Sequence, residues 1–291
     1  MNIILSGDES AGARALKEIA KTNHHLVAVV ASSTQSGINA LIQRAQMMRI
    51  PVWPGEKVQD PSLVETIQSL KADILVNVHA KHIICEEILQ APKYGCYNLH
   101  PGPLPEYAGV NQISWAIYNG EKRFGVTVHK MIPAIDAGPI ALKRYFDLDQ
   151  GETGLSLMTK CVNQGVVLML EFLDIAERSQ GEVPLEAQDM SKRRYYSKKD
   201  IPVKGKSEWD QPCVQIERLI RACNYQPFVS PWAHPVIEIK KCSMGVIDAE
   251  CTGIMSSDQP GSIRIDEKGD YLVCTRDHMI RLKKIVKEET A

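Results

Sequence analysis

The alternation of short apolar runs with amphipathic segments in the first half of the chain constrains the fold most strongly. The apolar runs are typical of strands buried on both faces, and they lie at 2–6, 26–31, 74–78, 96–99 and 126–129. The amphipathic segments repeat apolar residues at three- and four-residue spacing, as helices do, and they lie at 13–22, 37–48, 62–70 and 112–119. Buried strands separated by helices predict an α/β fold with a mostly parallel sheet that is covered on both faces.

The second half of the chain changes character. The pattern predicts a long helix over 153–178, after which helical periodicity is lost through 179–209. One more helix is predicted over 211–223, and four short β-like runs follow at 236–240, 261–265, 271–275 and 279–285. Strands this short with turn residues between them favour a small β-barrel or sandwich. We therefore predict a large domain over 1–185, a linker over 186–206 and a small β domain over 207–291.

Bulk composition excludes several classes of protein. Of the 291 residues, 44% are hydrophobic and 24% charged, which is the balance of a globular protein. The chain has no run near the ~18 apolar residues of a membrane span, and its first residues lack the basic region of a secretory signal, so we expect a cytoplasmic protein without membrane contact. The net charge of −1 provides no long-range field for a polyanion. Eight scattered cysteines argue against a zinc site or a disulfide framework and indicate buried thiols.

Two motifs at strand ends are explained without a nucleotide site or a metal site. GDESAG at 7–12 is neither a dinucleotide fingerprint nor a phosphate-binding loop, and we expect Asp8 or Ser10 to cap the next helix. In HAKHI, His79 and His82 are three residues apart without a nearby third ligand, so we predict no metal site. HAKHI matters more for its position, because ligands of parallel sheets bind at the carboxyl ends of strands.

The segment YNLHPGPLPEYAG at 97–109 lies at another such strand end. Asn98 and His100 are two residues apart on a predicted strand, so their side chains can reach one point. An amide N–H can stabilise a developing oxyanion, and an imidazole can transfer a proton near neutral pH. The prolines and Gly102 fix the loop and allow close backbone approach. A rigid loop with a capping histidine explains these residues equally well. Asp136, in the turn at 136–139, could orient an imidazole or simply form the turn.

Taken together, NLHPGPLPEYAG and the later AIDAGPI resemble the signature of the N10-formyltetrahydrofolate-dependent formyltransferases. Residues that match the motif are Asn98, His100, Leu104, Pro105, Gly109, Asp136 and Gly138. The segments 216–233 and 260–285 are similar to the C-terminal domain of methionyl-tRNA and sugar formyltransferases, so the resemblance covers nearly the whole chain. It implies a Rossmann-like formyltransferase domain followed by an OB-like β domain. An OB-like appendage often contributes an interface, so a homodimer is one state open to the chain.

The resemblance also implies a reaction and its residues. Asn98, His100 and Asp136 would be catalytic: Asn98 would bind the formyl oxygen, protonated His100 would assist that oxygen or the leaving N10, and Asp136 would hold His100 and accept the proton of the amine. N10-formyltetrahydrofolate would be the cosubstrate, without a metal. The residues implied to bind it are Ala80, Lys81, His82, Ile83, Ile84, Ile135 and Gly138. The residues implied to contact the acceptor are Gly102, Pro103, Leu104 and Asn111.

Departures from the family pattern bear on the acceptor. Gly102 replaces a usual Ser, Pro103 a usual Leu, and Ala108 stands where many relatives have a basic residue. SSTQSG at 32–37 replaces a long basic insertion that engages tRNA in methionyl-tRNA formyltransferases. We therefore expect the acceptor to be a small amine, above all an amino-sugar nucleotide or another biosynthetic amine. Methionyl-tRNA formyltransferase, formyltetrahydrofolate hydrolase and a non-catalytic folate-binding module remain alternatives.

Overall fold

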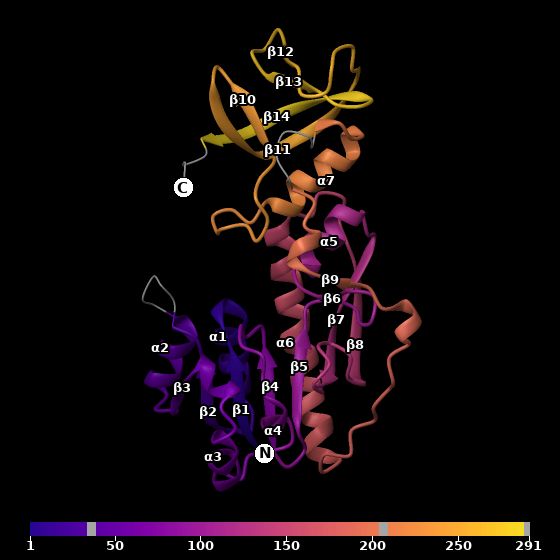
Figure 1. Cartoon of the computed structure of the whole chain (residues 1–291). Coiled ribbons are helices and arrows are strands. Elements are labelled where there is room, and N and C mark those ends of the chain that lie inside the picture. Colours follow the sequence, from indigo (N-terminus) through magenta and orange to yellow (C-terminus); the bar gives the residue numbers. More distant parts are fainter. Residues whose placement is uncertain (34–38, 204–208, 288–291) are drawn as a thin grey trace. The chain divides into compact units, whose positions relative to one another are not determined.

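The computed structural model describes residues 1–33, 39–203 and 209–287 (Figure 1). Its contacts divide the chain into two compact units, and each unit combines separate stretches of sequence. The first comprises Met1–Gly109, Gly125–Phe146 and Lys160–Tyr195. The second comprises Val110–Phe124, Asp147–Thr159 and the chain from Tyr196 onward. The domain boundaries at 185 and 206 stay a prediction.

A seven-stranded sheet forms the centre of the first unit, with strand order β3-β2-β1-β4-β5-β7-β8. Its strands are β1 (Asn2–Gly7), β2 (His25–Ala31), β3 (Val52–Pro54), β4 (Ile74–Val78), β5 (Cys96–His100), β7 (Arg123–Lys130) and β8 (Ile140–Asp147). The first five strands of this order pair in parallel, and β7 pairs antiparallel with β5. The predicted mostly parallel α/β fold is confirmed, whereas β3 and β8 were not predicted from the sequence.

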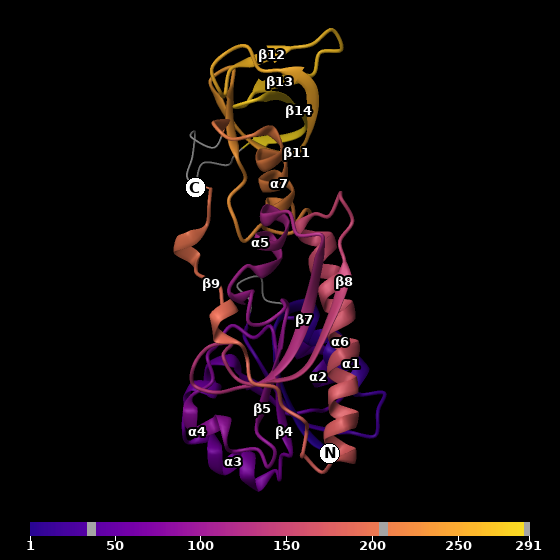
Figure 2. The same ribbon diagram turned by 90° about the vertical axis from the view of Figure 1, so that its right-hand side faces the viewer.

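Helices cover both faces of this sheet (Figure 2). The helices α1 (Glu9–Ile19), α2 (Ala40–Met47) and α6 (Gly154–Arg178) lie on one side. On the other side lie η1 (Gly55–Gln59), α3 (Leu63–Ser69) and α4 (Glu86–Leu89), packed through an apolar core. The predicted α6 is confirmed to within one residue. Among the described residues, no helix combines the length and the apolar character needed to cross a membrane.

Asp8 braces the carboxyl edge of the sheet. It occupies the N-cap position of α1, but its side chain makes no capping bond, so the expected capping role is wrong for Asp8. Its buried carboxylate instead accepts hydrogen bonds from the Ser32 N–H at 2.8 Å, the Ser32 hydroxyl at 3.1 Å and the Lys81 N–H at 3.0 Å. The carboxylate therefore joins segments that follow β1, β2 and β4, where buried polar groups need partners.

The second unit is built around an antiparallel sheet of order β10-β11-β14-β13-β12. Its elements are β10 (Val236–Ile239), β11 (Cys242–Met255), β12 (Ile263–Ile265), β13 (Tyr271–Cys274), β14 (His278–Lys287), α5 (Gln112–Asn119) and α7 (Cys213–Cys223). Ile216 and Ile220 of α7 pack into the core of this sheet. The predicted C-terminal β domain is confirmed. The long strand β11 was missed because Gly245, Asp248 and register shifts interrupt its alternation.

Cysteine usage agrees only in part with the sequence expectation. Six cysteines form no disulfide among the described residues, and four of them are buried. Cys213 and Cys251, which are 38 residues apart in sequence, form a disulfide pair within the second unit. Their spacing gave no indication of this pairing.

The segment after α6 is more than a connector. Glu186 forms a bridge with Ile140, and the Ala108 N–H donates to the Arg194 carbonyl over 3.0 Å. The Arg194 N–H donates to the Pro105 carbonyl over 3.2 Å. Two short strands, β6 (Ala108–Gly109) and β9 (Tyr195–Tyr196), form here. Two short 3₁₀ helices, η2 (Met190–Lys192) and η3 (Lys198–Asp200), form in the same part of the chain. As the sequence predicts, no residue of 186–195 is buried, but the main chain of this segment pairs with Ile140 and with the loop at 97–109.

Phe172 of α6 tests how the helix is held on the sheet. Its buried ring lies 4.4 Å from the Tyr97 ring, measured between centroids. Phe172→Ala should lower the free energy of unfolding by about 3–5 kcal/mol through lost contacts and a cavity. Val167→Ala is the matched control, because Val167 is 46% exposed on the same helix. Urea unfolding measures both, and equal midpoints for the two variants would contradict the packing described.

Candidate active site

A row of polar side chains crosses three neighbouring strands at the carboxyl end of β5. Asn98 and His100 point to the same face because they are two residues apart on the strand. The strand register places Asn98 between Asn77 of β4 and His129 of β7, and it places His100 beside Thr127. Asn77 Nδ2 donates to Asn98 Oδ1 over 2.9 Å, and Asn98 Nδ2 lies 3.1 Å from His129 Nε2. The amide of Asn98 is therefore held at both ends.

Asp136 reaches this row from the loop between β7 and β8. Its Oδ1 lies 3.5 Å from His100 Nδ1 and 3.6 Å from His129 Nε2, and its Oδ2 accepts the Gly109 N–H over 2.9 Å. Burial by itself would raise the pKa of Asp136, but the two imidazoles and the Gly109 N–H hold it well below its usual range. An ionised, largely buried carboxylate thus lies beside His100, and the three residues predicted to act together do meet.

His100 is buried and fixed by a main-chain contact. Its Nε2 lies 2.6 Å from the Tyr107 carbonyl oxygen, which can only accept, so Nε2 carries the proton. Its Nδ1 faces Asp136. Burial lowers the pKa of His100, although Asp136 and the Tyr107 carbonyl act in the opposite direction. The protonated His100 implied by the resemblance stays a prediction.

The loop that follows His100 is held by hydrogen bonds and by buried side chains. Thr127 Oγ1 donates to the Gly102 carbonyl over 2.8 Å and accepts the Leu104 N–H over 3.2 Å. A Cβ on Gly102 would lie 3.1–3.3 Å from Tyr107 and from His100 Nε2. Leu104 and Ala108 form a small buried cluster with Ile140. The side chains of Pro103 and Leu104 are buried, so an acceptor contact by either residue stays a prediction that would involve main-chain atoms.

Two side chains from the segment after α6 hold the Asp136 loop. Gln188 Nε2 donates to the carbonyls of Asp136 at 3.0 Å and Gly138 at 2.7 Å. The Arg193 guanidinium donates to the carbonyls of Asp136 at 3.1 Å and Ile135 at 2.7 Å. Asp136 itself has a left-handed backbone, with φ of 51°. We name Gln188 and Arg193 the loop clamp, because they fix the main chain that carries the carboxylate.

The residues implied to bind the cosubstrate lie on two loops. One loop follows β4, and the other joins β7 to β8. Ala80, Lys81, His82, Ile83 and Ile84 directly follow β4, and Asp8 holds the Lys81 N–H. Ile83 is 64% exposed and Ile135 is 43% exposed, so each loop offers an apolar side chain that a flat ring could cover, whereas Ile84 is buried. Gly138 admits no side chain, because a Cβ there would lie 1.8 Å from the Lys130 carbonyl oxygen. Their binding role stays a prediction.

Asn111, implied to contact the acceptor, belongs to the second unit. It is the N-cap residue of α5, with φ of 60°, and its side chain makes no capping bond. Its role also stays a prediction. Among the described residues, no three His, Cys, Asp or Glu side chains are grouped as metal ligands.

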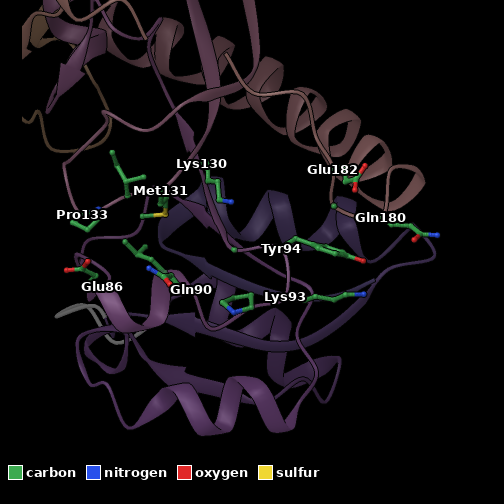
Figure 3. A pocket seen from close by; sticks show the side chains of 14 residues that line it. Glu86, Gln90, Lys93, Tyr94, Lys130, Met131, Pro133, Gln180 and Glu182 are labelled. Atoms are coloured by element: carbon green, nitrogen blue, oxygen red, sulfur yellow. The ribbon is translucent and has the colours of Figure 1, made fainter. Parts of the chain in front are cut away.

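A hollow of about 550 Å³ lies elsewhere in the first unit (Figure 3). Gly95 lines it and directly precedes β5, whereas His100 ends that strand, so the hollow opens at the opposite end of β5. Its labelled side chains carry both signs of charge, from Lys93 and Lys130 and from Glu86 and Glu182. It contains none of the predicted site residues.

Sequence reasoning missed several groups that shape the site. Thr127 and His129 alternate with Val126 and Val128, which indicates polar side chains on one face of a buried strand. Asn77 is a single amide within the apolar run ILVNV. These signals were available. Gln188 and Arg193 gave no signal, because their segment has no regular periodicity.

Comparison with known proteins defines the class. Residues 1–173 match the family model for formyl transferase, and residues 203–291 match the model for the formyl transferase C-terminal domain. The first match alone covers more than half of the chain. The chain therefore belongs to the formyl transferase family of enzymes, which confirms the resemblance carried by Asn98, His100 and Asp136.

Individual relatives differ in their named acceptors. Methionyl-tRNA formyltransferase of Thermotoga maritima is 27% identical, with 98% of this chain and 90% of the relative covered. The same enzyme of Clostridioides difficile is 28% identical, with 98% and 92% covered. Among solved structures, the sugar 3N-formyltransferase WlaRD, determined with dTDP and 5-N-formyl-THF, has a TM-score of 0.74 at 18% identity, with 99% of each chain covered. An N-formyltransferase of Helicobacter canadensis, in complex with folinic acid and dTDP-3-aminofucose, has a TM-score of 0.69 at 20% identity, with 96% and 98% covered. The structural likenesses concern the fold.

His79 should make the stability of the enzyme depend on pH. It has a left-handed backbone, with φ of 55°, and burial lowers the pKa of its imidazole to about 4, with His100 acting in the same direction. Its unfolded pKa is ~6.5, so the unfolded chain binds a proton first as the pH falls. The stability from neutral His79 is complete above ~6.5 and is lost as the pH falls towards 4.

His79→Asn should remove this dependence, because Asn does not titrate and tolerates a left-handed backbone. Between pH 6.5 and pH 4, the free energy of unfolding of the native enzyme should fall more steeply than that of the variant, by at most ~1.4 kcal/mol per pH unit. Urea unfolding at several pH values measures the two slopes. Parallel slopes would show that His79 titrates normally.

Proposed function

We propose that this enzyme transfers a formyl group from N10-formyltetrahydrofolate to the primary amine of a small acceptor, and that the acceptor is an amino sugar carried on a nucleotide. The observation that carries the proposal is the meeting of Asn98, His100 and ionised Asp136 at one strand end. The family assignment supports the reaction. Two structural neighbours, a sugar 3N-formyltransferase and an N-formyltransferase in complex with dTDP-3-aminofucose, support the acceptor.

The side chains can perform the proton transfers of this reaction. The amine forms a bond with the formyl carbon and loses a proton, and N10 gains a proton when the bond from the formyl carbon to N10 breaks. Asn98 Nδ2 has a second N–H beyond the one directed at His129, and it can donate to the formyl oxygen as negative charge develops. One such donor contributes about 3–4 kcal/mol to the transition state.

His100 would act as a base in this scheme. In the neutral ring with its proton on Nε2, Nδ1 is an acceptor that faces the Asp136 carboxylate at 3.5 Å. Nδ1 can accept the proton of the amine, and the anionic carboxylate stabilises the imidazolium that results. The same proton can then pass to N10. Asp136 thereby supports proton transfer by its charge, while its main chain is held by the loop clamp.

Methionyl-tRNA is the second candidate acceptor. The curated relatives named above favour it, because they are methionyl-tRNA formyltransferases over nearly the full length of the chain. Against it stand the net charge of −1 and the short segment SSTQSG, which lacks a basic insertion. Residues 34–38 of that segment lie outside the described residues.

A panel of acceptors decides between the two. Purified enzyme with N10-formyltetrahydrofolate should formylate at least one amino-sugar nucleotide and should act poorly on charged methionyl-tRNA. Efficient formylation of methionyl-tRNA, with every sugar nucleotide left unmodified, would overturn the acceptor assignment. Formate release without any added amine would instead identify a hydrolase.

His100→Asn tests the chemistry. We expect kcat to fall by about 10²–10⁴-fold because the base is removed, while tetrahydrofolate still binds. His25→Asn is the matched control, since His25 begins β2 at the other end of the sheet and should leave kcat unchanged. Retention of full formyl transfer by His100→Asn would remove the proposed mechanism. Equal binding of tetrahydrofolate, without formyl transfer even by the native enzyme, would indicate a binding module.

A further inference from the structure

The donor and acceptor roles in the row of polar side chains can be assigned from a main-chain carbonyl. His129 Nδ1 lies 3.2 Å from the Lys130 carbonyl oxygen. A carbonyl oxygen only accepts, so Nδ1 donates to it, and with that tautomer Nε2 accepts from the NH₂ group of Asn98 at 3.1 Å. Asp136 Oδ1 lies farther from the same nitrogen, at 3.6 Å. The NH₂ end of the Asn98 amide therefore faces β7.

The other end of the Asn98 amide depends on Asn77. Asn98 Oδ1 faces β4, where Asn77 Nδ2 donates to it over 2.9 Å. Asn77 is 9% exposed on the buried strand β4, and its own Oδ1 is buried without a hydrogen-bond partner among the described residues. A buried amide with one unpaired oxygen is costly. The same Asn77 amide therefore has one unpaired oxygen and one N–H that donates to Asn98.

We infer that Asn77 is a positioning residue, which keeps the Asn98 amide oriented with an N–H, and not its oxygen, available to the formyl group. This inference rests on the proposed function. Without Asn77, the oxygen of Asn98 would lose its only described donor on the β4 side, and the amide could rotate. A rotated amide would present an acceptor to a developing oxyanion, which removes the stabilisation.

Asn77→Leu tests the inference, because it removes the donor and keeps the number and branching of the side-chain heavy atoms. We expect kcat to fall about tenfold, with tetrahydrofolate affinity within twofold of the native value and an unchanged melting curve. The NH₂ resonances of Asn98, identified in ¹⁵N spectra by their loss in Asn98→Asp, should shift. Asn163→Leu is the matched control, because Asn163 is a partly buried Asn of α6 whose Oδ1 also lacks a partner among the described residues, and it should change none of these readouts.

Asn77→Asp provides a second variant with a readout that a purely structural role would not give. A protonated carboxyl can donate to Asn98 Oδ1, whereas a carboxylate cannot. The ratio of variant to native kcat should therefore fall as the pH rises. Because His79, His100 and Asp136 are present in both enzymes, the ratio reports the change that residue 77 makes. If Asn77→Leu fails to fold, Asn77→Asp still tests whether Asn77 orients the Asn98 amide.

Two results would overturn the inference: kcat within twofold for Asn77→Leu with unshifted Asn98 resonances, or a flat ratio for Asn77→Asp across the pH range. Failure of the proposed function is distinguishable from either result. If the native enzyme formylates no amine, the proposed function is lost. The Asn98 resonances then decide by themselves whether Asn77 orients the amide.

Discussion

A buried negative charge is the constraint on which the site depends. The Asp136 carboxylate is ionised although only 9% of its side chain is exposed. A buried charge is stable only with partners, and here these are His100, His129 and the Gly109 N–H. Each partner comes from a different part of the chain, so the charge requires the strand β5, the strand β7 and the end of the proline-rich loop to be in place together.

The same arrangement fixes the His100 ring. Nε2 donates to the Tyr107 carbonyl, and Nδ1 lies beside the Asp136 carboxylate. A positive charge on this imidazole therefore lies next to its counter-ion. The prolines and Gly102 around Tyr107 keep that carbonyl in place, since the loop is packed and has little freedom.

Much of the fold was predictable because buried parallel strands have a strong signal. The runs ending at Val78 and Leu99 placed the candidate site at strand ends, and the motif selected Asn98, His100 and Asp136. The rest depended on long-range pairing. Strand β8 and the loop clamp of Gln188 and Arg193 form because the chain returns to the Asp136 loop, and no local periodicity encodes such a return. The Asp8 brace was missed because the usual capping role of such a residue is local, whereas its actual partners are Ser32 and Lys81.

The loop clamp changes what counts as the catalytic part of the chain. A protein shortened at residue 185 would keep Asn98, His100 and Asp136, but it would lack Gln188 and Arg193, so four main-chain contacts to the Asp136 loop would be missing. Chimeras that exchange C-terminal domains between formyltransferases should therefore join their parts beyond residue 195. A junction placed earlier would change the active site while it was meant to change only the appendage.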